Sequence, residues 1–226
     1  MNAAARIGLL GGTLDPIHFG HVETAQAARR ALGLDRVYVL PSHVPPHRAQ
    51  QPLASGYHRF AMTALAIDGL DGLEANDIEL SAPGPSYTAD TLTRFRDRSG
   101  VPCSQIFFIT GADAFAEIET WHRYPDVLEL ANFAVVSRPQ FPVERLRDVL
   151  PSLAQRMLSV SNGDANSEPR IANHDIPHIF LIDAPTPDVS STEIRRRLLA
   201  GESVSGMVPD AVERHIRQHR LYANES

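Results

Sequence analysis

The feature that most constrains this chain is the short apolar run Arg6–Leu10 (RIGLL), which ends at the glycine pair Gly11-Gly12. Such a run predicts a buried strand that enters a tight loop. A helical pattern, HVETAQAARRALG, begins around Gly20, and Gly33 is placed to end it. A second β-rich run, Arg36–Leu40, follows. This order of strand, loop, helix and strand predicts a right-handed βαβ unit.

The same alternation continues along the chain. Further strands are predicted at Leu73–Leu80, Gln105–Thr110, Phe133–Ser137 and His178–Ile182. Helices are predicted at Tyr57–Ile67, Thr88–Arg98, Tyr124–Leu130, Ser191–Leu199 and Asp210–His219. Because the strands are continuously apolar, we expect helices on both faces of a parallel sheet. The predicted fold is α/β, a Rossmann-like doubly wound sheet with a small C-terminal helical extension.

The length suits one domain, and we expect the whole chain, residues 1–226, to form it, with an α/β core over about 1–185 and a helical part over about 186–226. The polar, turn-rich stretch Ser159–Asn173 predicts a surface loop or a partly disordered insertion rather than a domain boundary.

Composition excludes several classes of protein. The formal charge of −6 gives no general electrostatic reason to bind DNA or RNA. The single cysteine, Cys103, excludes an intramolecular disulfide and a cysteine-rich zinc site, and its apolar neighbours favour a buried structural thiol. No apolar stretch is long enough for a signal peptide or a membrane span. We therefore expect a soluble cytoplasmic protein without nucleic-acid or membrane partners, and a homo-oligomer remains open.

The segment Gly11–His21 (GGTLDPIHFGH) is the strongest candidate site. In an open parallel sheet, ligands bind where strands end and helices begin. Gly11 and Gly12 allow the backbone to approach a ligand closely. His18 and His21 are three residues apart at the start of a helix, so they lie near one face, and the free N–H groups of that helix end add positive potential. The segment predicts a polyphosphate site.

Other phosphate and metal sites fit this segment less well. It contains no G-x-x-x-x-G-K-[ST] P-loop, and GLLGG does not match the G-x-G-x-x-G dinucleotide fingerprint. A zinc site at His18 and His21 lacks a carboxylate or cysteine partner in the local sequence, so no protein-held metal is expected. The alternative, a simple glycine turn with two histidines at a helix end, explains either histidine alone better than it explains the whole segment.

Five ordered motifs carry a resemblance to a known family. They are G-G-T-x-D-P-x-H-x-G-H at 11–21, P-S-H-V-P-P-H-R at 41–48, S-Y-T-A-D-T-L at 86–92, G-A-D at 111–113 followed by W-H-R-Y at 121–124, and S-S-T-E-I-R at 190–195. Together they resemble the H-x-G-H nucleotidyltransferases, and specifically the nicotinate-nucleotide adenylyltransferases. The chain departs from the family pattern at Leu14 and Val189, where an apolar residue replaces another, and at the Ser159–Asn173 insertion.

The resemblance implies site roles that the residues alone do not fix. It assigns catalysis to His18, His21 and Arg195. It assigns ATP binding to a larger set, Gly11, Gly12, Thr13, His18, Gly20, His21, Gly111, Asp113, Arg138, Ser191, Thr192 and Arg195. Taken alone, Ser190 and Glu193 would form an ordinary helix capping box, and Gly111–Asp113 an ordinary strand-to-helix turn. Arg196 and Arg197 are expected to be solvated or in salt bridges.

The resemblance also implies the second half of the site. Asp15, His47, Thr88, Trp121 and Tyr124 would bind the mononucleotide, with Trp121 stacking on the pyridine ring. A position in the core is the default alternative for Trp121. His43 and His47 do not form a helical metal pair, because Val44-Pro45-Pro46 lies between them.

The implied reaction joins AMP from ATP to nicotinate mononucleotide, giving deamido-NAD and pyrophosphate in NAD biosynthesis. The implied cofactor is Mg²⁺, held mainly by the ATP phosphates. Two alternatives remain: another adenylyl- or cytidylyltransferase of the superfamily, such as one acting on phosphopantetheine, and a non-catalytic nucleotide-binding module.

Overall fold

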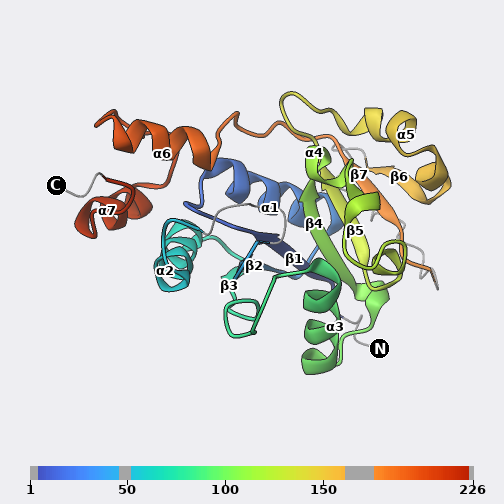
Figure 1. Cartoon of the computed structure of the whole chain (residues 1–226). Helices are drawn as coiled ribbons and strands as arrows, with labels where there is room; N and C mark the ends of the chain where they lie inside the picture. The colour runs from blue at the N-terminus through green and yellow to red at the C-terminus, as the bar shows by residue number, and fades with distance from the viewer. Residues whose placement is uncertain (1–4, 46–51, 161–175, 224–226) are drawn as a thin grey trace.

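A computed structural model describes residues 5–45, 52–160 and 176–223. Seven parallel strands form one sheet: β1 (Ile7–Gly12), β2 (Arg36–Pro41), β3 (Leu73–Ala75), β4 (Ile106–Gly111), β5 (Asn132–Val136), β6 (Met157–Val160) and β7 (Ile179–Ile182). The α-helices are α1 (Phe19–Leu32), α2 (Gly56–Ile67), α3 (Thr88–Ser99), α4 (Ala112–Phe115), α5 (Leu146–Val149), α6 (Ser191–Leu199) and α7 (Asp210–Gln218). Figure 1 shows the sheet between its helices. The predicted doubly wound α/β fold is confirmed.

The predicted βαβ unit is present at the N-terminus. β1 pairs in parallel with β2, and α1 connects them. Gly33 ends α1 in the left-handed conformation, at φ 58°, and its N–H donates to the carbonyl of Arg29. A residue with a Cβ would be strained there, so the glycine fixes where the helix stops.

The strand order is β3-β2-β1-β4-β5-β7-β6. The chain therefore builds outward in one direction from β1 through β2 and β3, and in the other from β4 onward. The crossover between these directions lies between the adjacent strands β1 and β4. In open α/β sheets, ligands bind at the carboxyl ends of the strands at such a switch point. Gly12 and Gly111 are the last residues of these two strands.

Two hydrophobic clusters cover the two faces of the sheet. Side chains alternate along each strand, as the pleat requires. Leu9, Phe108 and Phe133 belong to the cluster that contains residues of α3 and α4. Leu10 and Ile109 belong to the cluster that contains α1, α2, α6 and α7. The C-terminal helices therefore share a core with the N-terminal βαβ unit.

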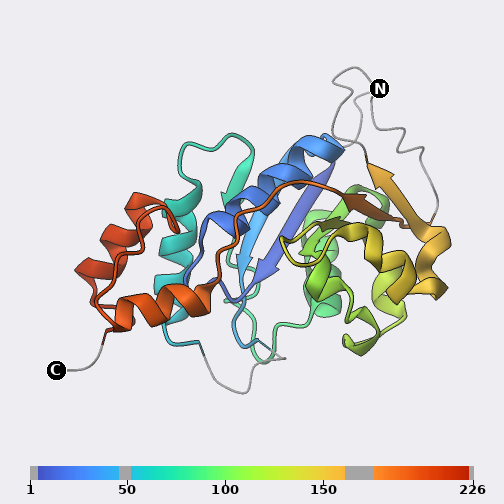
Figure 2. The same cartoon turned by 90° about the horizontal axis from the view of Figure 1, so that it is seen from above.

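The segment after β7 returns to the start of the chain. It runs along α1 to reach α6 and then α7, which lies beside α2 (Figure 2). The backbone N–H of Phe19 donates to the carbonyl of Met207 at 3.0 Å, which joins the first residue of α1 to this segment. The C-terminal helical part is thus placed next to the loop between β1 and α1.

Some sequence predictions of elements were wrong. The strand predicted at Leu73–Leu80 ends at Ala75, because the side chain of Asn76 accepts a hydrogen bond from the Ile78 N–H and turns the chain. The helix predicted at Tyr124–Leu130 is a 3₁₀ turn over Asp126–Glu129.

The edge strand β6 and the short helices α4 and α5 were missed, because each is only four residues long. Ser159 and Val160 belong to β6, and the rest of the predicted Ser159–Asn173 loop lies outside the described residues. Cys103 is half-buried, not buried as its neighbours suggested. Among the described residues, no helix has the length and apolar character needed to cross a membrane.

Candidate active site

The loop from β1 to α1 lies at the switch point of the sheet. Gly12 ends β1, and His18 is the N-cap residue of α1 with extended backbone angles. Leu14 within the loop has φ 51° and is buried at 1% exposure, so packing holds an L-residue in the left-handed region. No side chain caps the first turn of α1. The N–H groups of Phe19 and His21 already donate to the carbonyls of Met207 and His18. This helix end therefore offers an anion the Gly20 N–H and the positive end of the helix dipole.

His18 and His21 face each other at this helix end. Their ring centroids are 3.8 Å apart with an interplanar angle of 34°. Burial of His18, helped by the nearby cation of Arg138, lowers its pKa to about 3. His18 is therefore neutral at pH 7 and offers one N–H and one lone pair. Its buried Nδ1 has no hydrogen-bond partner among the described residues.

Arg138 joins the loop to the end of β4. Its Nε lies 3.8 Å from Oδ1 of Asp113, which is in α4 directly after β4. A Cβ added at Gly20 would lie 3.0 Å from ring atoms of His18 and 3.4 Å from an Nη of Arg138, and one added at Gly111 would lie 3.1 Å from its Nε. The two glycines therefore leave room for the guanidinium. The structure therefore brings together Gly20, Gly111, Asp113 and Arg138, four of the residues predicted to bind ATP.

The N-terminus of α6 meets the same loop. The hydroxyl of Ser191 donates to the carbonyl of Pro16 at 2.9 Å, and Arg195 donates to the carbonyl of Asp15 at 2.6 Å and to the Thr192 hydroxyl at 3.4 Å. Ser190 caps the helix by accepting from the Glu193 N–H.

The carboxylate of Glu193 does not complete the capping box, because Arg196 and Arg197 bind it. These two arginines, predicted to be solvated or in salt bridges, are in salt bridges. Arg195, in contrast, contacts the loop between β1 and α1 through the carbonyl of Asp15.

Asp15 is a buried centre of hydrogen bonds, with 3% of its surface exposed. Its Oδ1 accepts from the Tyr222 hydroxyl at 2.7 Å and from the Ala54 N–H at 3.1 Å, and its Oδ2 accepts from the Leu53 N–H at 2.9 Å. Burial and the neighbouring carboxylate raise the pKa of Tyr222, so its hydroxyl stays protonated and donates. The carboxylate of Asp15 thus organises the protein around the loop, and its predicted contact with the mononucleotide stays a prediction.

The sequence did not reveal Arg59 as a residue that supports the site, and its surface is only 2% exposed. Its guanidinium donates to the carbonyls of Thr13 at 2.8 Å, Ser42 at 2.6 Å and Ala54 at 3.1 Å. Burial lowers its pKa, with Asp15 acting in the opposite direction. Arg59 holds the glycine loop against the segment after β2. An arginine on the otherwise apolar face of α2 was the signal that could have revealed it.

The two segments predicted to bind the pyridine nucleotide also meet. The ring of Tyr87, which precedes Thr88 at the start of α3, stacks on His122 with centroids 4.2 Å apart. Arg123 lies 3.9 Å from Asp90. The neighbouring Trp121 is half-buried.

Aromatic side chains of the sheet pack against Trp121. Trp121 packs edge-on against Phe108 at 6.0 Å and Phe133 at 6.4 Å. Tyr124 donates to Glu119 at 3.5 Å. Both the core position and the ligand-facing position predicted for Trp121 are therefore compatible with its surroundings. His47 lies outside the described residues.

Glu79 is a second functional candidate that the sequence did not reveal. Its carboxylate is 5% exposed, accepts from the Thr91 hydroxyl at 2.9 Å, and lies 3.7 Å from where a Cβ of Gly11 would stand. Burial raises its pKa to about 7, against the lowering effect of its hydrogen bonds and of Arg94 and Arg59. A carboxyl group whose pKa is near neutral pH therefore lies next to Gly11, where β1 enters the loop to α1.

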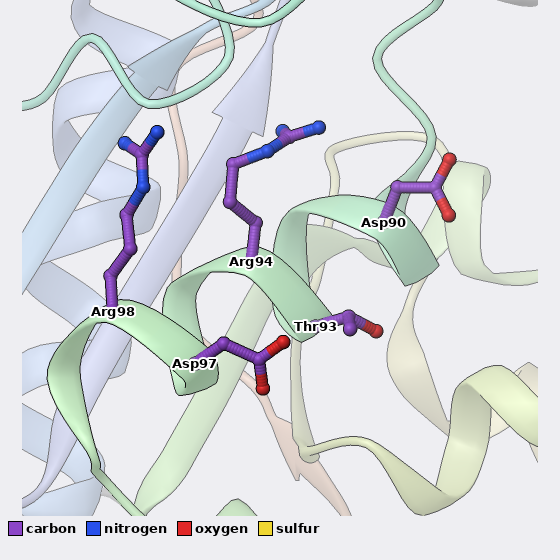
Figure 3. A pocket seen from close by; sticks show the side chains of 5 residues that line it. All are labelled: Asp90, Thr93, Arg94, Asp97 and Arg98. Atoms are coloured by element: carbon purple, nitrogen blue, oxygen red, sulfur yellow. The ribbon is translucent and has the colours of Figure 1, made fainter.

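A separate depression of about 520 Å³ lies along α3 (Figure 3). Its lining side chains come from successive turns of that helix, and they are Asp90, Thr93, Arg94, Asp97 and Arg98. Arg96, from the other side of the same helix, binds Asp97 at 3.1 Å. This surface contains none of the predicted site residues, so it is not the candidate site.

Groups able to hold a metal ion are found away from the phosphate loop. Within the described ranges, the only set of three or more histidine, cysteine or carboxylate side chains with converging ligand atoms is His58, His215 and His219. The loop itself offers Asp15, whose oxygens already accept hydrogen bonds, and the exposed Asp113 lies nearby at the start of α4. The absence of a protein-held metal at the loop between β1 and α1 stays a prediction.

Comparison with known proteins places the chain in a family. Residues 9–197 match the cytidylyltransferase-like family. A "Probable nicotinate-nucleotide adenylyltransferase" of Desulfatibacillum aliphaticivorans is 37% identical over 225 residues, covering 96% of this chain and 99% of the relative. A protein of the same name from Moorella thermoacetica is 38% identical over 217 residues, covering 96% and 91%.

The fold is shared with a solved structure from Plasmodium falciparum. Nicotinic acid mononucleotide adenylyltransferase complexed with NaAD superposes with a TM-score of 0.73 at 17% identity, covering 97% of this chain and 98% of that one. The relatives at 37% and 38% identity, which match over nearly their whole length, show that this chain belongs to the nicotinate-nucleotide adenylyltransferase family within the cytidylyltransferase-like proteins.

Proposed function

We propose that this protein transfers AMP from ATP to nicotinate mononucleotide, releasing pyrophosphate and forming deamido-NAD. The observation that carries the proposal is the convergence at the sheet's switch point. Two imidazoles, the N-termini of α1 and α6, Arg138 and Arg195 surround one loop. Helix N-termini and guanidinium groups together suit a polyphosphate.

The chemistry requires positioning more than acid or base catalysis. A 5′-phosphate oxygen of the mononucleotide attacks the α-phosphorus of ATP, a new P–O bond forms, and the bond from the α-phosphorus to the bridging oxygen breaks in line. The attacking phosphate is already ionised at neutral pH, so no strong base is needed. The charge that develops on the α-phosphate and the leaving pyrophosphate must be stabilised.

Neutral and positively charged residues would stabilise the phosphate charge in different ways. His18, neutral because its pKa is about 3, would donate a single N–H to the triphosphate. Arg138 and Arg195 would supply positive charge from opposite sides of the loop. Gly11 and Gly12 would let phosphate approach the backbone, with Thr13 fixed through its carbonyl by Arg59. His21 would donate to the same phosphates as His18.

Mg²⁺ fits the reaction as part of the substrate. The loop contains few free carboxylate oxygens, because Asp15 is bound by Tyr222 and two backbone N–H groups. Mg²⁺ commonly keeps several waters and binds through substrate phosphates. We therefore assign the cation to ATP, where it would neutralise charge on the leaving pyrophosphate.

The mononucleotide would lie at the end formed by Thr88 and Trp121. The Tyr87–His122 stack and the Asp90–Arg123 pair hold these two segments together, and Trp121 presents an aromatic surface braced by Phe108. An aromatic face beside the N-terminus of α3 suits a flat ring that carries a carboxylate. The cytoplasmic location and any homo-oligomer stay predictions.

The test is pyrophosphate release by the purified chain with Mg²⁺. ATP with nicotinate mononucleotide is compared with ATP plus nicotinamide mononucleotide, CTP plus nicotinate mononucleotide, and ATP plus phosphopantetheine. We expect the first pair to give the highest kcat/KM, and deamido-NAD to accumulate in step with pyrophosphate. Release only with CTP or phosphopantetheine would favour another transferase of the superfamily. Nucleotide binding without any release would favour the non-catalytic module.

A further inference from the structure

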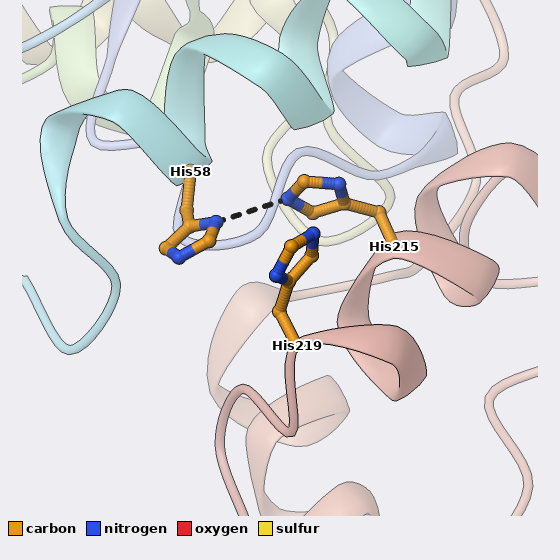
Figure 4. Close-up of side chains that lie close together, drawn as sticks. All are labelled: His58, His215 and His219. Atoms are coloured by element: carbon orange, nitrogen blue, oxygen red, sulfur yellow. Dashed lines mark hydrogen bonds between the residues drawn. The ribbon is translucent and has the colours of Figure 1, made fainter.

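Three histidines meet between α2 and α7, away from the phosphate loop. Figure 4 shows the rings of His58, His215 and His219 turned toward one another. Nδ1 of His58 lies 3.1 Å from Nε2 of His215, and one ring nitrogen from each of the three lies within 4.8 Å of the others. The ring centroids are 4.5 to 5.3 Å apart.

The fold positions these rings from two separate elements. His215 and His219 are four residues apart on α7 and its C-cap, so their side chains share one face of the helix. Val212 and Ile216 of α7 are buried in the core shared with α2, which fixes how that helix faces α2. His58 is in the first turn of α2. His58 and His215 are half-buried and His219 is exposed, so solvent can reach the cluster.

The chemistry of the cluster suits a particular class of cation. Imidazole nitrogen is a good ligand for Zn²⁺, Ni²⁺, Co²⁺ and Cu²⁺, whereas Mg²⁺ and Ca²⁺ prefer oxygen. Zn²⁺ binds histidine nitrogen at about 2.0–2.1 Å, which places the nitrogens of a tetrahedral site roughly 3.3 Å apart. Nδ1 of His58 and Nε2 of His215 are 3.1 Å apart, close to that value, and the ligand atom of the exposed His219 lies within 4.8 Å of theirs, so its ring would have to move inward when the cation binds. Histidine is largely neutral at pH 7, so its lone pairs are available.

We propose that His58, His215 and His219 bind one divalent cation of the zinc class and thereby fasten α7 to α2. The fourth position would hold water, because the cluster contains no carboxylate or thiolate. This site is distinct from the Mg²⁺ that enters with ATP, in both its ligands and its position. The proposal does not depend on the proposed catalytic function.

A cation bound at α7 would also hold a segment that contacts the loop between β1 and α1. Three residues after His219, Tyr222 donates to the carboxylate of Asp15 in the phosphate loop. A bound cation would therefore hold the segment that carries this donor. Because it binds only the folded arrangement, it would also stabilise the whole chain and slow local opening of α7.

The experiment uses the full chain, stripped of metal with a chelator, in a non-coordinating buffer at pH 7 without ATP. Titration with ZnCl₂ is followed by calorimetry and thermal unfolding. We expect one Zn²⁺ per chain at this site and a Tm increase of about 5–10 °C when free Zn²⁺ is about 100 times its Kd. Co²⁺ added instead should give the intense visible absorption of a tetrahedral complex, whereas Mg²⁺ should not displace Zn²⁺.

Matched variants decide where the metal binds. His219→Gln changes an exposed side chain, and we expect at least a tenfold weaker Zn²⁺ affinity; the double variant His215→Gln/His219→Gln should lose the site. His122→Gln and His21→Ala should bind Zn²⁺ as the parent does. If the double variant keeps the parent's affinity and Tm increase, or if the parent does not bind Zn²⁺, the proposal is wrong. If the double variant has a lower metal-free Tm, the lost Tm increase is measured from its own baseline.

Discussion

The hydroxyl of Tyr222 donates a 2.7 Å hydrogen bond to Oδ1 of Asp15, although the two residues are 207 positions apart. Tyr222→Phe removes only that donor and leaves a buried carboxylate oxygen with one fewer partner. We expect the free energy of unfolding to fall by about 1–3 kcal/mol, with a lower kcat/KM because the loop is less well held. Urea unfolding and steady-state kinetics measure both. Tyr57→Phe is the matched control, because Tyr57 is 91% exposed, and an equal loss in both variants would contradict the role of the bond.

His21 lies at the N-terminus of α1 with its ring against His18. Replacing it with alanine removes one donor to the triphosphate in the transition state, and we expect kcat to fall on the order of 10²–10³-fold. Pyrophosphate release under saturating substrates measures the effect. Arg30→Ala, on an exposed turn of the same helix, should turn over as the parent does. Near-parental kcat in His21→Ala would exclude the role.

His18 is expected to stay neutral through the physiological range because its pKa is about 3. The folded-state pKa lies below the ordinary value of 6.5, so the folded state binds this proton less readily than the unfolded chain does. Stability from His18 is therefore present above pH 6.5 and is lost as pH falls toward 3, with a slope approaching about 1.4 kcal/mol per pH unit. His18→Asn should remove that slope. An imidazole NMR resonance of His18 that titrates between pH 6 and 7 would refute the assignment.

Glu79 gives the opposite dependence because its pKa is raised to about 7. The folded state holds this proton more tightly than the unfolded chain, so the contribution is full below about pH 4.5 and is lost as pH rises through 7. Glu79→Gln keeps the shape without the charge, and above pH 7.5 we expect it to be more stable than the parent by about 2 kcal/mol. Urea unfolding at pH 5 and pH 8 tests this. Glu74→Gln, with an exposed carboxylate, is the control, and an identical change in both variants would contradict the prediction.

Arg59 donates to four backbone carbonyls through the fork of its guanidinium. Lysine in its place supplies one point charge and cannot span those acceptors, so we expect Arg59→Lys to lower stability by about 2–4 kcal/mol. The KM values for both substrates should rise, because the two loops that Arg59 joins are each expected to touch substrate. Arg30→Lys, at 61% side-chain exposure, should change neither quantity. A stable variant with parental KM values would exclude the bridging role.

The sequence predicted the sheet well because its central strands are continuous apolar runs that end at glycine. The run QIFFIT, for example, became β4 with Gly111 as its last residue. Prediction failed where local hydrogen bonds outweigh the apolar pattern, as at Asn76, which ends β3 early. It also failed for β6, a short edge strand beside a polar stretch.

The site was predicted through its motifs, and most of those segments meet in the structure. The features of the site that the sequence did not predict depend on partners far away along the chain. Arg59 and Tyr222 contact the loop from positions that no local spacing relates to it, and the protonation of His18 and Glu79 depends on burial by other elements. Such properties belong to the tertiary structure, so a motif cannot encode them.

The contacts of Ser191 and Arg195 with Pro16 and Asp15 join residues 175 and 180 positions apart. A ribosome therefore makes the loop between β1 and α1 about 175 residues before the side chains of α6 that bind its backbone. A nascent chain that stops before α6 has the βαβ unit but lacks Ser191 and Arg195, whose side chains donate hydrogen bonds to the backbone of the loop. The site is therefore complete only after α6 has been made, and shortened chains that lack α6 but still fold are expected to be inactive.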